Sequence, residues 1–144
     1  MIFPYLDREP LIPLEIRKTD GNWLEFYAYV DSGAGYSVFH SDHAEVLGIN
    51  IYKGRKINLT VGDGSEIPAF VHKLPVRFAG KKFIAEISFS PSLGIGTNIL
   101  GIKSFFDNFK ICFNSKKQQV EILPFWKKMK NEAVKIVVYV PESN

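Results

Sequence analysis

The sequence predicts a mainly β fold. Of its 144 residues, 46% are hydrophobic and 14% are aromatic, which is enough for one compact domain with its own core. Twelve Phe and six Tyr, residue types that strands favour, exceed what a helical bundle usually contains. Eleven Gly and eight Pro recur between short stretches in which apolar and polar residues alternate. These features favour many short strands joined by tight turns.

The charge and the metal-binding residue types argue against several function classes. The net charge is +3 and acidic and basic residues are interspersed, so no nucleic-acid partner is expected, even for the lysine-rich tail. The lone Cys112 rules out an intrachain disulfide. His40 and His43 have no third ligand at metal-site spacing, so surface or helix-capping roles are expected for them. We expect neither a metal nor a cofactor.

The amino-terminal residues 1–10 form a lead-in without a periodic pattern. Asp7, Arg8 and Glu9 interrupt the apolar core that a signal peptide needs. No stretch reaches the roughly eighteen consecutive apolar residues of a membrane-spanning helix. A cytoplasmic protein without a membrane partner is therefore expected.

A hairpin is predicted next. Residues 11–17 and 23–30 both follow a period of two, and the segment 19–22 between them is dense in turn formers. Their inward faces are predicted to consist of Ile12, Leu14 and Ile16 on the first strand and Leu24, Phe26, Ala28 and Val30 on the second.

A short strand over residues 36–39 and a helix of barely two turns over residues 41–48 follow. Asp42 and Glu45 have the spacing of a capping box at the start of this helix, and Gly48 is predicted to end it.

A second hairpin is predicted from residues 56–61 and 67–78, joined by the tight turn Gly62-Asp63-Gly64-Ser65. Pro68 and Pro75 interrupt the second strand, and such prolines suit an edge strand.

The rest of the chain continues the β pattern. A turn at 79–82 precedes a strand over 83–90, and residues 91–98 form a loop whose apolar side chains need cover. The remaining expected elements are the segment 99–101, a short helix containing Phe105, Phe106 and Phe109, strands at 110–114 and 119–123, a linker or short helix at 125–130, and an apolar strand at 135–140.

Asp31 lies where the apolar strand 23–30 passes into a turn that contains Gly33 and Gly35. A buried strand excludes water and fixes the position of the carboxylate, and glycines permit the close backbone approach that acid chemistry uses. An Asp that only completes an Asx-type turn after a strand fits the same residues. The tripeptide Asp-Ser-Gly alone is a weak signal and by itself favours the structural interpretation, so the surrounding sequence must decide.

Three features occur in a fixed order: Asp31-Ser32-Gly33-Ala34 after a strand, a hairpin tipped by Gly62-Asp63-Gly64, and Asn98-Ile99-Leu100-Gly101 before a helix. They resemble the retropepsin-like aspartic proteases, the single-domain relatives of retroviral proteases. The first feature looks like that family's Asp-Thr/Ser-Gly-Ala turn, and the third is similar to its second motif. Ser32 replaces the more frequent Thr, and Ile102-Lys103-Ser104 stands where many relatives carry Arg-Asp.

The resemblance implies a fold class and domain boundaries. It implies a closed β-barrel of the retropepsin-like acid protease type with one or two short helices, completed as a homodimer. Residues 11–123 would form this domain, residues 1–10 a lead-in, and residues 124–144 a carboxy-terminal extension. The strand of the extension is expected in the dimer interface, because termini interleave in retroviral relatives and this strand has no evident partner in its own chain.

The resemblance also implies aspartic endopeptidase activity. The chemistry needs two facing carboxylates and the chain supplies one Asp-Ser-Gly, so Asp31 and its symmetry mate would form the catalytic pair. Two carboxylates about 3 Å apart share one proton. The ionised partner activates water for attack on the scissile carbonyl, and the protonated partner donates to the carbonyl oxygen. The expected substrate is a peptide or protein in an extended, largely apolar segment.

The other site residues receive roles by the same resemblance. Ser32 would form a hydrogen bond across the dimer axis, and Gly33 and Ala34 would support the turn around the carboxylate. Gly62, Asp63 and Gly64 would form a flap over the substrate. Leu93, Ile95 and Ile99 are expected to line substrate pockets, although core packing fits Ile99 equally well. Leu100 and Gly101 would be the structural part of the second motif.

The alternative on the same fold is a dimeric module that binds a peptide or partner strand without cleaving it. The presence of Asp31, a hydroxyl at Ser32 and Gly33 together favours catalysis, because a binding module has no chemical need for all three.

Overall fold

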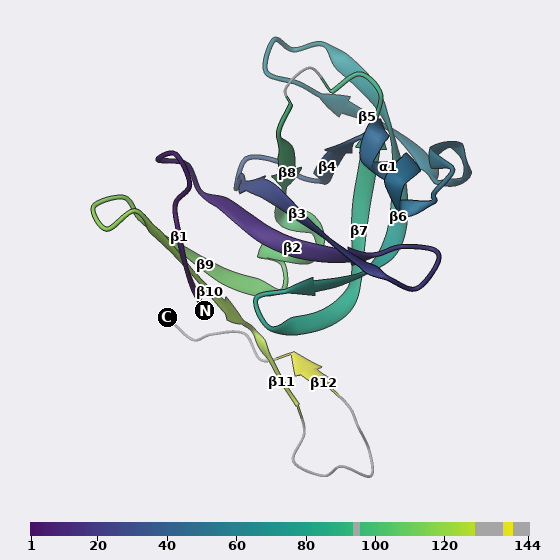
Figure 1. Cartoon of the computed structure of the whole chain (residues 1–144). Helices are drawn as coiled ribbons and strands as arrows, with labels where there is room; N and C mark the ends of the chain where they lie inside the picture. Colours follow the sequence, from purple (N-terminus) through teal and green to yellow (C-terminus); the bar gives the residue numbers. More distant parts are fainter. Residues whose placement is uncertain (94–95, 129–136, 140–144) are drawn as a thin grey trace.

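The computed structural model describes residues 1–93, 96–128 and 137–139 (Figure 1). Strands dominate, with the helix α1 (Ser41–Leu47) and short helical segments at Ile51–Lys53 and Ile102–Phe106. The strands are β1 (Ile2–Pro4), β2 (Leu11–Arg17), β3 (Trp23–Val30), β4 (Ser37–His40), β5 (Arg55–Thr60), β6 (Glu66–Phe78), β7 (Lys81–Ser90), β8 (Asn98–Leu100), β9 (Phe109–Asn114), β10 (Gln119–Pro124), β11 (Trp126–Lys128) and β12 (Val137–Tyr139).

Six strands close into a barrel. The largest sheet has the order β2-β3-β8-β4-β7-β6-β5, and an additional pairing of β2 with β6 joins the ends of the first six. Within this ring β8 runs parallel to β3, and β4 runs parallel to β7. The expected closed β-barrel with short helices is confirmed. The β5–β6 hairpin projects from the barrel at the end opposite to β9 and β10 (Figure 1).

A separate three-stranded sheet of order β1-β10-β9 packs against the barrel. The contact is aromatic, because the ring of Phe78 on β6 lies edge-on to Phe105 and Phe109 at centroid distances of 5.1 and 5.0 Å. Val120 and Ile122 of β10 are also fully buried in the shared core. Barrel and terminal sheet therefore share a single hydrophobic core.

The first hairpin has the predicted bounds and faces. Ile12, Leu14 and Ile16 of β2 are buried against the core, and Phe26, Ala28 and Val30 of β3 are buried opposite them, while Leu24 is half-buried. The β6–β7 turn uses Ala79 and Gly80, both with positive φ, as a two-residue hairpin of this kind requires.

Two predictions about capping and prolines need correction. His40 rather than Asp42 caps α1, because the Nδ1 atom of His40 accepts a hydrogen bond from the backbone N–H of Asp42 at 3.1 Å. The expected C-terminal stop at Gly48 is confirmed by its left-handed φ of 80°.

The strand β6 is not an edge strand, since it lies between β5 and β7. Pro68 nevertheless pairs only with β5 and Pro75 only with β7, so each proline lies where β6 has one neighbour.

Several boundaries also differ from the predictions. The lead-in contains β1, which pairs with β10, and Phe109 begins β9 instead of belonging to the preceding helix. The segment predicted as a linker or short helix contains β11. This strand pairs with β12 in the same chain, so the premise that the carboxy-terminal strand lacks an intrachain partner is wrong. The predicted strand at 135–140 is described only over Val137–Tyr139.

No helix among the described ranges is both long and apolar enough to cross a membrane.

Candidate active site

Asp31 follows directly after β3, and the end of β8 holds its backbone. The N–H of Asp31 donates to the carbonyl oxygen of Leu100 at 3.0 Å, which extends the parallel pairing of β3 with β8 by one residue. Val30 and Leu100 are both buried there. The two halves of the sequence motif therefore meet at the same barrel end, and the Asp31 side chain begins where the buried strand stops.

The turn after Asp31 folds around its carboxylate. The backbone N–H of Gly33 donates to Oδ1 of Asp31 at 2.8 Å, and the N–H of Ala34 donates to the Asp31 carbonyl at 3.2 Å. A Cβ atom on Gly33 would lie 3.2 Å from that Oδ1, which is tighter than an ordinary contact. Glycine thus allows the backbone to approach the carboxylate closely. Asp31 is half-buried, and Ser32 and Gly33 are exposed.

The segment that follows β8 supports this turn from behind. The N–H groups of Ile102 and Lys103 donate to the carbonyl oxygens of Ala34 and Gly35 at 2.8 and 3.0 Å. Gly101, which is buried, lies between the two pieces of chain. A Cβ at this position would lie 2.5 Å from the Ala34 oxygen and 2.6 Å from the Tyr36 oxygen. Only glycine permits this close crossing without a backbone shift.

Buried hydroxyls complete the support. Oγ of Ser37 accepts a hydrogen bond from the N–H of Gly101 at 2.9 Å, and the hydroxyl of Ser88 donates to the Ser37 carbonyl at 2.6 Å. Both serines are completely buried. Sequence reasoning missed them, because neither Ser37 at the start of β4 nor Ser88 near the end of β7 carries a local signal that distinguishes it from a surface serine.

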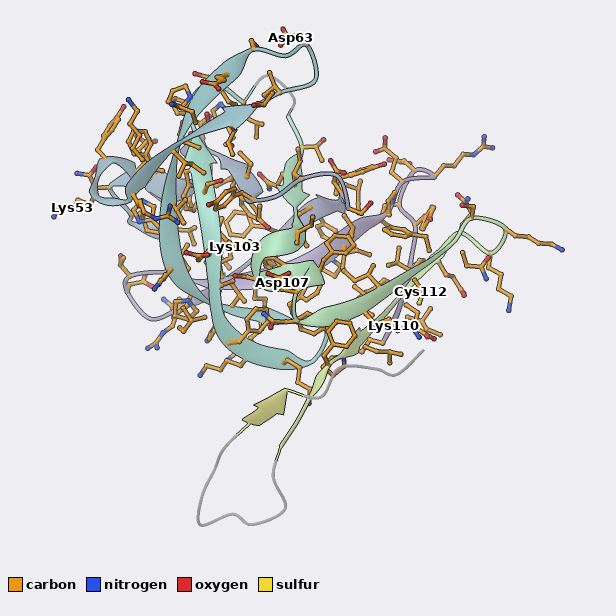
Figure 2. The ribbon with its side chains drawn as sticks, turned by 180° about the vertical axis from the view of Figure 1, so that it is seen from behind. Lys53, Asp63, Lys103, Asp107, Lys110 and Cys112 are labelled. Atoms are coloured by element: carbon orange, nitrogen blue, oxygen red, sulfur yellow. The ribbon has the colours of Figure 1, made fainter. Side chains whose placement is uncertain are left out.

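The turn between β5 and β6 is also shaped by an aspartate. Oδ1 of Asp63 accepts hydrogen bonds from both the N–H and the hydroxyl of Ser65, at 2.8 and 2.5 Å, and Gly64 has a left-handed φ of 85°. These bonds to Ser65 lower the pKa of the Asp63 carboxyl below its usual 3.8. Asp63 lies at the tip of the hairpin, as Figure 2 shows.

A cavity of about 830 Å³ separates the Asp31 turn from this hairpin. Of the predicted site residues, Asp31, Gly33, Ala34, Gly62, Asp63, Leu93 and Ile99 line it. Ser32, Gly64, Leu100 and Gly101 do not line it, and Ile95 lies outside the described residues. The lining that sequence reasoning missed consists of Gly35, Tyr36, Val38, Leu59, Thr60, Val61, Ser65, Ile67 and Ser92.

Apolar side chains form much of the cavity wall between the Asp31 turn and the Asp63 turn. Val38 and Ile99 are opposite one another on paired strands, and Leu59 and Ile67 face them from the hairpin. The alternation of apolar and polar residues over 56–61 predicted this strand of the hairpin. It did not predict which face of the strand lines the cavity, because that depends on the curvature of the folded hairpin. No three His, Cys, Asp or Glu side chains in the described ranges are grouped so that they could hold a metal ion.

The architecture is similar to that of known structures. The crystal structure of a retropepsin-like aspartic protease from Rickettsia conorii matches with a TM-score of 0.62 and 21% sequence identity, over 85% of this chain and 97% of that chain. EIAV protease in complex with an inhibitor matches with a TM-score of 0.47 and 23% identity, over 67% of this chain and 84% of that one. No family model and no curated protein sequence matches. The first likeness shows that the chain has the retropepsin-like fold, as predicted.

Proposed function

We propose that the protein is an aspartic endopeptidase that acts as a homodimer, with Asp31 of each copy forming the catalytic pair. The observation that carries this proposal is the position of Asp31. Its carboxylate lies at the wall of an apolar cavity, held by a glycine turn that β8 and the following segment support, with the β5–β6 hairpin on the other side. The fold of the Rickettsia conorii protease is consistent with it.

The need for a second copy follows from the acids of the cavity. Among the described residues that line it, the only other carboxylate is that of Asp63. That carboxylate accepts two hydrogen bonds from Ser65 at the hairpin tip, and its lowered pKa disfavours the protonated form that a catalytic acid requires. A second Asp31, related by a two-fold axis, supplies an equivalent group in an equivalent turn.

The paired carboxylates would then work as one acid and one base. Close approach of two like charges keeps one proton on the pair. The ionised carboxylate takes a proton from water while the water oxygen attacks the scissile carbonyl carbon, and the protonated carboxylate gives its proton to the carbonyl oxygen. Collapse of the resulting diol breaks the C–N bond as a proton passes to the leaving nitrogen. No covalent enzyme intermediate forms.

The cavity supports a preference for apolar side chains beside the cut bond. Its wall carries Val38, Leu59, Val61, Ile67, Leu93 and Ile99. The strand-like hairpin above it offers backbone groups to an extended peptide, and its closure would exclude bulk water from the reacting atoms. Gly62, Asp63 and Gly64 would form the moving tip, and Ser32 would bond across the axis.

The test is cleavage of a diverse peptide library at acidic to neutral pH by the wild type and by Asp31→Asn. This change keeps the size of the side chain and its ability to accept from the Gly33 N–H, but removes the acid. Cleavage by the wild type alone, at apolar flanking positions, is the expected result. Peptide binding without cleavage by both proteins would favour the non-catalytic module instead.

A further inference from the structure

The segment Ile102–Phe106, which supports the Asp31 turn, does not have a regular helical backbone. Lys103 has a ψ of 126° and Ser104 has a positive φ of 72°. A left-handed conformation is unfavourable for a residue with a side chain, so contacts from outside the segment must maintain it. The segment nevertheless donates the hydrogen bonds that hold Ala34 and Gly35.

Glu86 on β7 provides contacts of this kind at two consecutive residues. Its backbone N–H donates to Oγ of Ser104 at 2.9 Å, and its Oε2 lies 3.3 Å from Nζ of Lys103. Figure 2 shows Lys103 beside β7. The Glu86 side chain is only 18% exposed, so water screens its contacts less than those of a surface carboxylate.

The same carboxylate reaches the hairpin that covers the cavity. Oε1 of Glu86 lies 3.5 Å from Nη2 of Arg55, the first residue of β5. The Lys103 ammonium in turn lies 5.5 Å from the centre of the Tyr36 ring, which lines the cavity. A single carboxylate thus connects the base of the hairpin, the segment behind the Asp31 turn and one cavity wall.

We infer that Glu86 is a positioning residue for Asp31, acting through Lys103, and that it links the geometry of the Asp31 turn to the β5 strand. The catalytic part of this inference rests on the proposed peptidase function. The ion pair itself adds little to global stability, because Lys103 and Arg55 are about half exposed. Its effect is on the position of the turn, where small displacements of a catalytic group reduce turnover strongly.

The first measurement does not depend on activity. Amide hydrogen exchange of Ile102 and Lys103, the donors to Ala34 and Gly35, is compared in the wild type, Glu86→Gln and Lys103→Met. Glu86→Gln keeps the backbone bond to Ser104 and the Lys103–Tyr36 contact, so it removes only the charge. Both variants are expected to exchange at least about fivefold faster at these two amides. Lys18→Met is the matched control, because it removes the Lys18–Asp20 pair, also 3.3 Å long, in the β2–β3 turn.

The second measurement uses peptide cleavage. Glu86→Gln and Lys103→Met are expected to lower kcat by roughly tenfold with KM changed less than twofold. Lys103→Arg is expected to keep a kcat near that of the wild type because it keeps the charge.

Exchange rates equal to those of Lys18→Met would overturn the positioning role, whether or not the protein is a peptidase. Faster exchange with unchanged kcat in an active enzyme would overturn the link to Asp31. A wild type that cleaves nothing would defeat the proposed function and leave the exchange result to decide the structural role.

Discussion

The Ser37 hydroxyl oxygen accepts a hydrogen bond from the Gly101 N–H at 2.9 Å, although the two residues are 64 positions apart. The first residue of β4 is thereby joined to the residue that follows β8, directly behind the Asp31 turn. Both groups are buried, so water cannot replace either one.

Ser37→Ala is expected to lower the free energy of unfolding by about 1–3 kcal/mol, because it leaves the Gly101 N–H without its acceptor. Urea denaturation measures the change. Ser92→Ala, at an exposed position, is the control and is expected to change stability by less than about 0.5 kcal/mol. Equal changes in the free energy of unfolding for the two substitutions would show that the buried Ser37–Gly101 hydrogen bond does not stabilise the fold.

Gly101→Ala is expected to destabilise the fold by about 1–3 kcal/mol or more, since the new methyl group would meet two backbone oxygens at 2.5 and 2.6 Å. Gly35→Ala tests the same addition nearby, where no atom lies within 4 Å of the new Cβ, and is expected to be tolerated. Thermal unfolding of both variants gives the comparison. A Gly101→Ala protein as stable as Gly35→Ala would contradict the described crossing of the two segments.

Asp63 is expected to titrate below the ordinary carboxyl value of 3.8, because Ser65 hydrogen bonds favour its ionised form. Because the pKa is lowered in the folded state, the bonds stabilise the hairpin tip fully at pH values above 3.8. This stabilisation is lost as the pH falls through the folded pKa. The Ser65 amide shift, followed by NMR against pH, reports the titration. Ser65→Ala should move the Asp63 pKa upward, and a midpoint above 3.8 in the wild type would refute the turn geometry.

His43 should make the stability of the fold depend on pH below 6.5. Burial lowers the pKa of its imidazole from 6.5, with the neighbouring His40 adding to this and Asp42 opposing it. The ring packs against Phe26 at a centroid distance of 5.1 Å. The folded state therefore binds a proton less readily than the unfolded chain, and stability is lost as the pH falls below 6.5 through the folded pKa.

His43→Phe keeps the aromatic contact and removes the titration. Chemical denaturation of both proteins over this range is expected to show a shallower loss of stability on acidification in His43→Phe. Parallel pH profiles would mean that other groups cause the loss.

The sequence predicted local elements well where the alternation of apolar and polar residues and the positions of turn-forming residues indicated the same element. The β2–β3 hairpin has the predicted bounds because Leu11–Arg17 and Trp23–Val30 each bury one face of an alternating run. The α1 cap was misread because Asp42 and His40 both fit near a helix start, and only the backbone angles show that His40 is outside the helix. Phe109 was assigned to a helix because aromatic spacing alone does not mark where a strand begins.

The pairing of strands that are distant in the sequence was harder to predict. The parallel pairing of β3 with β8 and the closing contact of β2 with β6 leave no mark in either strand's own residues. The resemblance brought Asp31, Asp63, Leu93 and Ile99 into one site, and all four line one cavity. Glu86 and Ser37 went unnoticed, because their importance comes from partners distant in sequence.

The central claim is that each chain supplies half of the active site. It is tested most directly by adding a ninefold excess of Asp31→Asn chains to a fixed amount of wild type under conditions that allow subunit exchange, and measuring peptide cleavage. If two copies of Asp31 are needed, random pairing reduces the activity to about a tenth of that with an inert protein added instead. Unchanged activity in the mixture would show that one chain carries a complete site, and would contradict the account.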